Sequence, residues 1–392
     1  MNKIQYIKYM QRVHFHLNRY IIFIIQIFVI LLNTRCKNEG NENQNIYTIP
    51  IYENLKNRSK EGLKEIVKQI SYIKLETSSI CLMGRIQYFV GSKDYFFIGD
   101  ARGIFQFSRN GKFIRNIGTI GRGPGEFIGY RDYAVNENLK RLYLLTNFTD
   151  EVLIYDFEGN YLSNIKLSDD TKYRIDCLND SLLVLQTHPL SYNSLISTEI
   201  IDLKGEITFK AKIKTNEKLL SDKSTYQFDN KLFVRDTYND TIFLVTKEEL
   251  IPYSVLDIGK STDQKDNSAD ELKYSIIPNR ILESDRYILI FFSYNQVVCT
   301  ALYNKETRQT SVTIPNDSYN AGIINNIDNG MNYNVFGLPF TIKSIYNEWT
   351  MLIEPVDLLE WCENNTVDGE LGTIVTNLKE DDNPIIMLIQ PL

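Results

Sequence analysis

The sequence predicts an all-β protein, a six-bladed β-propeller in which an N-terminal strand pairs with the C-terminal blade to close the ring. The first observation is a repeat of about 47 residues. Three segments place an aromatic or apolar residue four positions before a glycine, and they end at Gly111, Gly159 and Gly205. Each glycine lies between two stretches of alternating apolar residues, as in a hairpin. The second observation is that long amphipathic helical windows are nearly absent, so repeated short strands favour propeller blades.

The strands of each unit can be placed in order. An earlier strand opens each of the three units, and two further units with weaker turns follow up to about residue 314. A last partial unit contains 349–353, and an isolated strand at 70–75 precedes the first unit. Pairing these two ends gives a sixth blade and leaves only short, protected edges.

Two other fold classes fit less well. Parallel α/β folds need a helix between strands, and the best helical window, 60–69, comes before the repeats, where it predicts a short helix. A β-sandwich could use the same strands, but it would not require a period near 47 residues.

The N-terminus has the pattern of an export signal. No acidic residue precedes Glu39, and a basic region leads into the apolar run Ile21–Leu32, which is 12 residues long and too short to span a membrane. Cys36 follows this run where a lipoprotein signal places its acylated cysteine. An ordinary signal peptide or an uncleaved anchor remains an alternative, because Arg35 puts a charge at the expected cleavage position.

We therefore expect a lipoprotein signal peptide at 1–35, a polar tether with a short helix at 36–69 and the propeller at 70–392. Removing the first segment changes the formal charge from −6 to −11, because it carries five basic residues and no acid. Such a domain is a poor partner for nucleic acid, which favours basic surfaces. The expected location is the outer membrane or cell surface, with the lipid anchor at Cys36 holding the protein to the membrane.

Cysteine use leaves two possibilities open. No two of the five cysteines are close enough for a C-x-x-C pair. If Cys36 is acylated, four remain, and in an exported protein they could form disulfides or stay as isolated buried thiols. These four are Cys81, Cys177, Cys299 and Cys362.

Several motifs, taken in order, carry a family resemblance. They lie at Ile73–Glu76, Asn110–Ile114, Gly118–Phe127, Tyr238–Ile242, Pro252–Gly259 and Ile327–Gly330. On these residues the chain resembles the six-bladed β-propeller lipoproteins of Bacteroidetes, with a TolB-like or NHL-like architecture. The resemblance runs from about Ile73 to Trp361. It implies export, a lipid anchor and a propeller, and it implies no established reaction.

The glycine-rich stretch Gly121–Glu126 is the sharpest local motif. It lacks the Lys-Ser/Thr ending and the following helix of a phosphate-binding P-loop. Its glycines would let backbone amides approach a ligand, and Arg122 could pair with an anionic group. We therefore expect a ligand site at Arg122, Gly123, Gly125 and Glu126. The alternative is a tight structural loop in which Arg122 and Glu126 pair with each other or with neighbouring blades.

Histidine and metal chemistry find little support. Two of the three histidines lie in the expected signal peptide, which leaves His188 alone in the mature chain. We therefore predict no catalytic residue, no metal site and no cofactor. Paired carboxylates remain open for glycoside chemistry. Acids near strand ends or blade connections are Asp100, Asp132, Asp150, Asp236 and Asp240.

The expected function is therefore binding rather than catalysis. We expect an interaction module for a glycan, a peptide or an envelope protein. The alternatives are a carboxylate-dependent glycan hydrolase or lyase acting at the channel mouth, and a purely structural part of an envelope complex.

Overall fold

The computed structural model describes only part of the chain. The described residues are 46–56, 62–168, 172–187, 196–212, 224–235, 240–259, 276–295, 297–314, 322–327, 330–331, 341–344 and 348–392. The chain divides into two units, Met1–Ile46 and Tyr47–Leu392, and the propeller is formed by the second. The expected signal peptide, Cys36, His188 and Asp236 lie outside the described residues. Among the described residues, no helix is long and apolar enough to cross a membrane.

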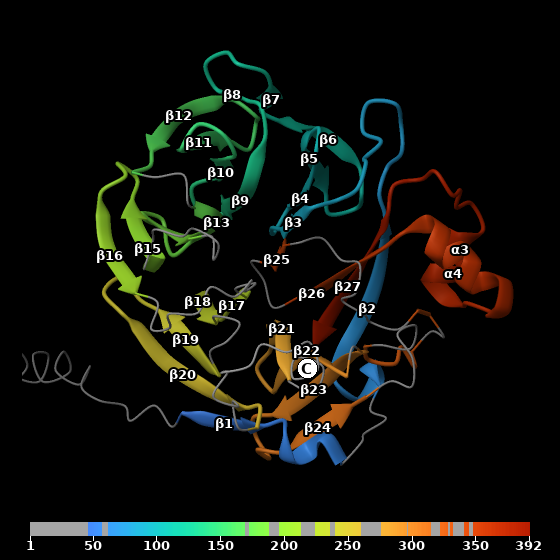
Figure 1. Cartoon of the computed structure of the whole chain (residues 1–392). Helices are drawn as coiled ribbons and strands as arrows, with labels where there is room; N and C mark the ends of the chain where they lie inside the picture. Colours follow the sequence, from blue (N-terminus) through green and yellow to red (C-terminus); the bar gives the residue numbers. More distant parts are fainter. Residues whose placement is uncertain are drawn as a thin grey trace, which may run out of the picture. The chain divides into compact units, whose positions relative to one another are not determined.

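Six small sheets in a ring form the predicted six-bladed propeller (Figure 1). In blades 1 to 5 the strands follow chain order from the centre outwards. Blade 1 contains β3 (Tyr88–Gly91), β4 (Tyr95–Asp100), β5 (Gly103–Ser108) and β6 (Phe113–Ile117). Blade 2 contains β9 (Tyr130–Asn136), β10 (Arg141–Thr146), β11 (Glu151–Asp156) and β12 (Tyr161–Lys166). Blade 3 contains β13 (Lys172–Cys177), β14 (Leu182–Thr187), β15 (Ile196–Asp202) and β16 (Ile207–Lys212).

Blades 4 and 5 repeat this arrangement. Blade 4 contains β17 (Ser224–Phe228), β18 (Lys231–Arg235), β19 (Thr241–Val245) and β20 (Leu250–Asp257). Blade 5 contains β21 (Ile277–Glu283), β22 (Tyr287–Tyr294), β23 (Val297–Asn304) and β24 (Thr310–Thr313). The innermost strand of every one of these five blades was missing from the strands expected from the sequence.

Blade 6 closes the ring with both ends of the propeller. It contains β26 (Trp349–Ile353), β27 (Ile385–Pro391) and, as its outermost strand, β2 (Val67–Lys74). β2 pairs antiparallel with β27, from Lys74 opposite Ile385 to Val67 opposite Pro391. The predicted closure by an N-terminal strand is therefore confirmed.

Additional strands extend two blades. β1 (Tyr47–Pro50) pairs in parallel with β20 at the outer edge of blade 4. β25 (Thr341–Ser344) pairs in parallel with β3 at the inner edge of blade 1. The propeller sheets therefore begin at Tyr47, ahead of the boundary expected at residue 70.

The helices differ from the expectation. Within the described part of 60–69 there is no α-helix, but a 3-10 turn, η2 (Leu63–Glu65), after which β2 begins. Pairing with β27 outweighs the weak helical pattern there, as tertiary contacts commonly do. A second 3-10 turn, η1, spans Glu53–Lys56. Two short helices that the sequence had not indicated, α3 (Pro355–Asn364) and α4 (Gly369–Val375), lie between β26 and β27.

The repeat glycines are required because neighbouring blades approach closely. All three have a left-handed backbone, with φ of 81°, 84° and 87° at Gly111, Gly159 and Gly205. A Cβ at Gly111 would lie 2.2 Å from the carbonyl oxygen of Lys74 on β2. At the other two glycines it would lie 3.1 and 3.0 Å from carbonyl oxygens of the preceding blade's outermost strand. The 47-residue period therefore reflects one close backbone contact between neighbouring blades at each of these three glycines.

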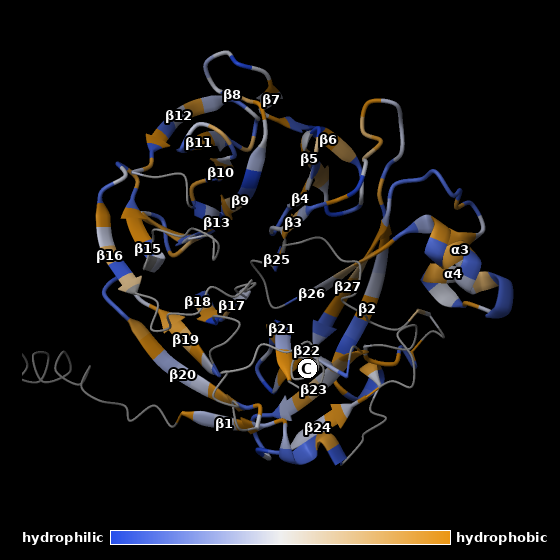
Figure 2. Ribbon diagram, in the orientation of Figure 1, coloured by the Kyte–Doolittle hydropathy of each residue, from blue (hydrophilic) through white to orange (hydrophobic). Residues whose placement is uncertain are grey.

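The core lies between adjacent blades. One cluster joins Phe97 and Ile104 of blade 1 to Leu142 and Leu144 of blade 2. In Figure 2 the strands carry long apolar stretches, whereas the segment around α4 contains many hydrophilic residues. None of the four cysteines after Cys36 forms a disulfide, which resolves the choice in favour of separate thiols.

Candidate functional site

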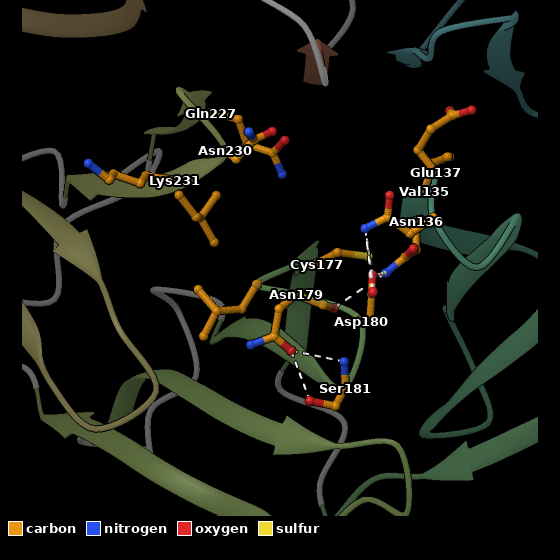
Figure 3. Close-up of a pocket in the computed structure, with 13 residues that line it drawn as sticks. Val135, Asn136, Glu137, Cys177, Asn179, Asp180, Ser181, Gln227, Asn230 and Lys231 are labelled. Atoms are coloured by element: carbon orange, nitrogen blue, oxygen red, sulfur yellow. Dashed lines mark hydrogen bonds between the residues drawn. The ribbon is translucent and has the colours of Figure 1, made fainter. Parts of the chain in front are cut away.

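A pocket opens where turns of blades 2, 3 and 4 meet (Figure 3). It lies at the ends of the innermost strands β9, β13 and β17, and its volume of about 460 Å³ is typical of small-ligand sites. Its lining is formed by Val135, Asn136, Glu137, Asn138, Cys177, Leu178, Asn179, Asp180, Ser181, Gln227, Asn230, Lys231 and Leu232. Amides and carboxylates dominate this list.

One wall is a fixed polar network that joins blades 2 and 3. Asn136 and Asn138 donate their side-chain amides to Oδ1 of Asp180, over 3.0 and 3.1 Å. Oδ1 of Asn136 accepts the backbone amide of Leu139 at 2.9 Å, so this side chain is held at both ends. The wall is thus ordered before any ligand arrives, which lowers the entropy lost on binding.

A tight turn places Asp180 at this wall. The side-chain oxygen of Asn179 accepts the backbone amides of Ser181 and Leu182, at 2.9 and 3.0 Å. Such a turn, in which a side chain bonds the backbone two residues on, is the usual role of Asn between strands. Asp180 follows it directly and reaches the two amides of blade 2.

The opposite wall comes from blade 4. The turn residues Asp229 and Asn230 both have positive φ, 51° and 55°, as in a two-residue type I′ hairpin. Figure 3 shows Gln227 and Asn230 across the pocket from Asn136 and Glu137. Gln227 and Asn230 both line the pocket, and no side chain among the described residues is hydrogen-bonded to either amide.

The charges in the pocket are mixed. Glu137 and Asp180 are acidic and Lys231 is basic; the Glu137 carboxylate also accepts the ammonium group of Lys140. Burial raises the pKa of the Cys177 thiol far above its usual range, so it stays protonated and is a poor nucleophile. The pocket is therefore suited to binding a polar ligand through hydrogen bonds.

The glycine-rich loop expected to bind ligand lies elsewhere. It connects blades 1 and 2 between β7 (Thr119–Ile120) and β8 (Glu126–Phe127), at the outer rim of the ring (Figure 1). Arg122 and Gly123 are exposed. The Glu126 carboxylate does not pair with Arg122; it accepts the backbone amide of Gly123 at 2.7 Å. Gly125, with φ of 73°, packs on the ring of Tyr161.

The four loop residues and the pocket are on opposite faces of the ring. The loop precedes the first residue of β9, whereas the pocket begins at the last two residues of β9 and continues into the following turn. None of Arg122, Gly123, Gly125 and Glu126 is among the lining residues.

Among the acids singled out earlier, Asp132 belongs to a buried charge cluster. Lys343 of β25 lies 2.7 Å from its Oδ2 and 3.3 Å from Oδ1 of Asp176. Burial raises the pKa of Asp176, and Lys343 opposes this in part. Burial acts to lower the pKa of Lys343, but the charges of Asp132 and Asp176 outweigh it and raise that pKa. A close carboxylate pair thus exists, but the single charge of Lys343 pairs with both of its members.

Two other described acids, Asp100 and Asp150, have structural roles. Asp100 is buried and binds the guanidinium of Arg102 at 2.8 Å. Asp150 has a positive φ in the turn between β10 and β11. In the part of the chain that the structure describes, no group of three or more His, Cys, Asp or Glu residues could hold a metal ion.

Sequence reasoning missed all the pocket residues. The polar side chains of the pocket come from the turns after three successive inner strands, at 136–138, 179–181 and 229–231. Asn and Asp are also the ordinary turn residues. The only available signal was that these polar turns recur at the same place in successive blades, and the inner strands before them had not been recognised.

Comparisons with other proteins identify a family and a solved structure of similar fold. Residues 46–390 match the family described as a domain of unknown function, DUF4934. A solved structure of a Bacteroides fragilis protein classified as exported superposes with a TM-score of 0.71 at 19% identity, covering 88% of this chain and 99% of the other. A DUF4221 family member from Bacteroides vulgatus has a TM-score of 0.49 at 10% identity, with 85% and 99% covered. No curated protein matches the chain.

Proposed function

Since this chain belongs to the DUF4934 family, whose description assigns no activity, we propose from its own residues that it is an exported, lipid-anchored propeller that binds a glycan. The observation that carries the proposal is the pocket between the inner turns of blades 2, 3 and 4. A peptide and an envelope protein are the other partners that a propeller face could hold.

The lining chemistry favours a sugar among these ligands. Side-chain amides both donate and accept hydrogen bonds, and carboxylates accept them. Sugar hydroxyls need donors and acceptors in mixed order. Asp180, Gln227 and Asn230 supply both on facing walls, and Asn138 lies beside Asp180, to which it donates. Val135, Leu178 and Leu232 add apolar surface for the ring carbons.

The pocket carboxylates do not favour glycan hydrolysis. A glycosidase of the usual kind needs one carboxyl group with a raised pKa and a second one free to act on the sugar. Asp176 has the raised pKa, but it lies beside Lys343 and is absent from the pocket lining. The pocket carboxylates Asp180 and Glu137 already accept side-chain donors.

Export and anchoring are proposed from the N-terminal pattern. The basic region, the apolar run Ile21–Leu32 and Cys36 have the order of a lipoprotein signal. The structural neighbour from Bacteroides fragilis is itself classified as exported. The polar residues that follow Cys36 would serve as a tether that lets the propeller face outwards from the membrane.

Replacing Cys36 tests the anchor. The Cys36→Ser variant should move from the membrane fraction to the soluble fraction of the cell envelope, since a serine cannot take the acyl groups that hold the protein there. Fractionation with detergent-phase partition measures this. The control is Cys362→Ser, which changes a half-buried thiol near the C-terminal end of the sequence, and this variant should stay in the membrane fraction. Equal membrane association of both variants would contradict acylation at Cys36.

Replacing pocket amides tests the binding site. Purified protein should bind at least one member of a glycan array, and Gln227→Ala and Asn230→Gly should each weaken that binding about tenfold. The reason is that one lost hydrogen bond corresponds to roughly 1–1.5 kcal/mol, and 1.4 kcal/mol to a factor of ten. Glycine is chosen at Asn230 because it accepts the positive φ of the turn.

The matched control removes the same chemistry from another surface. Asn164→Ala deletes an exposed amide on β12, where it bonds to Glu151, and it should leave glycan affinity unchanged. Binding that is insensitive to both pocket variants would reject the pocket. Binding only to peptides, in a parallel peptide array, would contradict the proposal that the ligand is a glycan.

A further inference from the structure

β25 precedes blade 6 in the sequence but pairs with a different blade. Four residues of sequence separate it from β26 of blade 6, yet it pairs in parallel with β3 of blade 1, from Thr341 opposite Tyr88 to Ser344 opposite Gly91. In the described part of blade 6 only β26, β27 and β2 are present, whereas blades 2, 3 and 5 have four strands. Figure 1 shows β25 near the middle of the ring. A four-residue strand is thus brought across to a neighbouring blade.

β25 places the ammonium group of Lys343 among several hydrogen-bond acceptors. Lys343 donates to Oδ2 of Asp132 at 2.7 Å, to the carbonyl of Tyr133 at 3.1 Å and to the carbonyl of Ile175. Oδ1 of Asp176 lies 3.3 Å away. An ammonium group has three N–H donors, so three hydrogen bonds and a second carboxylate satisfy it fully.

The acceptors are held in place independently of the lysine. Asp132 Oδ1 accepts the amide of Tyr133 at 2.8 Å, and its Oδ2 accepts the amide of Ile175 at 3.0 Å. The bond from Ile175 ties β9 of blade 2 to β13 of blade 3, and the bond from Tyr133 fixes the carboxyl group on β9. The side chains of Asp132 and Asp176 are only 1% and 4% exposed. Asp132, Asp176 and the carbonyls of Tyr133 and Ile175 form what we call the cradle. It is therefore a rigid feature of the ring rather than a product of β25.

One acceptor is left over. Oδ2 of Asp176 is buried and has no hydrogen-bond partner among the described residues. A buried carboxylate oxygen without a partner costs free energy, so the cradle has more acceptor capacity than Lys343 uses. This spare oxygen points to a ligand with a further donor beside its ammonium group.

We propose that Asp132, Asp176 and the carbonyls of Tyr133 and Ile175 form a binding site for a primary ammonium group, and that Lys343 occupies it from within the chain. An amine-bearing ligand takes the place of Lys343 when β25 leaves the edge of β3. The same two inner strands continue into the pocket, where Asn136 and Cys177 line it. The amine site and the pocket are thus separate sites on β9 and β13.

Chemical rescue tests the cradle. Lys343→Ala should lower the melting temperature, because it leaves two buried carboxylates without their cation. Propylammonium, the missing end of the lysine side chain, should restore the melting temperature of this variant at a concentration at least about tenfold lower than that needed to shift the wild type. Tetramethylammonium, which has no N–H donor, should not restore it. Equal effects of both cations would overturn the proposal.

Two further variants make the result specific. Lys74→Ala removes the half-exposed lysine that pairs with Asp382 at 2.6 Å, and propylammonium should not rescue it. In Lys343→Ala/Asp132→Asn the cradle loses a charge, so the rescue should disappear. Rescue that persists in this double variant would show that the amine binds elsewhere.

Binding measurements on the wild-type protein distinguish the two possible sources of the amine. A peptide lysine is represented by N-acetyl-lysine amide, and an amino sugar by glucosamine, each compared with its N-acylated form by calorimetry. Binding by one of the amines, lost on acylation and tightened in Lys343→Ala, supports the site and identifies the source. Absence of binding by both amines in the wild type and in Lys343→Ala would reject it.

Discussion

The Gly111→Ala variant is expected to lose at least about 3 kcal/mol of unfolding free energy. A left-handed backbone costs a non-glycine residue roughly 1–2 kcal/mol, and overpacking adds about 1–3 kcal/mol. Both apply here, because φ is 81° and the new Cβ would lie 2.2 Å from the carbonyl oxygen of Lys74. Neither atom can move easily, since the amide of Glu76 donates to the Gly111 carbonyl at 2.8 Å. Urea unfolding followed by tryptophan fluorescence measures the loss.

Gly129→Ala is the matched control for this prediction. Gly129 is not among the glycines with positive φ, and the nearest atom to a new Cβ is 3.6 Å away on the Phe148 ring. Its expected effect is within about 0.5 kcal/mol. If both variants were equally stable, the contact between blades 6 and 1 would not be the reason for the repeat glycine.

The Glu283→Ala variant is expected to lose about 3–5 kcal/mol, the usual effect of removing one partner from a buried ionic network. The Glu283 side chain is fully buried and lies 2.5 Å from the ammonium group of Lys305. Its carboxylate also accepts the hydroxyls of Tyr226 and Tyr253, at 2.8 and 2.6 Å. Alanine would leave two phenols without their acceptor where blades 4 and 5 meet, and Lys305 would keep only the Ser284 carbonyl at 2.6 Å. Thermal and urea unfolding measure the change.

Two variants separate the network from simple loss of charge. Glu283→Gln keeps an acceptor oxygen for the tyrosines and should lose less stability than alanine. Glu306→Ala breaks an exposed pair with Arg286, at 3.0 Å, and should change stability by less than about 1 kcal/mol. A loss for Glu306→Ala as large as that for Glu283→Ala would contradict the importance of burial.

The propeller could be predicted because its repeat is imposed by backbone geometry. Gly111, Gly159 and Gly205 each need a left-handed φ and a missing side chain at the same point of a blade, and these needs appear in the sequence as a fixed residue type at a fixed spacing. The closing strand at 70–75 could also be predicted. It stands alone before the first repeat unit, so the incomplete C-terminal unit was the partner left for it. It is the outermost strand of blade 6.

The inner strands could not be recognised in the same way. β13 reads Lys-Tyr-Arg-Ile-Asp-Cys and β17 reads Ser-Thr-Tyr-Gln-Phe. Charged and polar residues interrupt the alternation on which strand prediction depends. They are tolerated because the inner strands bury their charges in networks such as Asp132–Lys343–Asp176. The partner in that network is more than 150 residues away in sequence, so no local pattern could indicate it.

The candidate site was hidden for a related reason. Asn179 and Asn230 have the sequence environment of turn residues, and they do form turns. Their part in a common pocket depends on three blades meeting at one place. The glycine-rich loop attracted attention because its composition is unusual, yet its glycines make room for the carboxylate of Glu126, which would lie 2.0 Å from a Cβ at Gly121.

The most direct test of the proposed function is a crystal structure of the protein with the glycan that binds it most tightly. We expect sugar density between the two walls of the pocket, hydrogen-bonded to Asn138 on one side and to Gln227 and Asn230 on the other. Density beside Arg122 in the loop between blades 1 and 2, with the pocket empty, would contradict it.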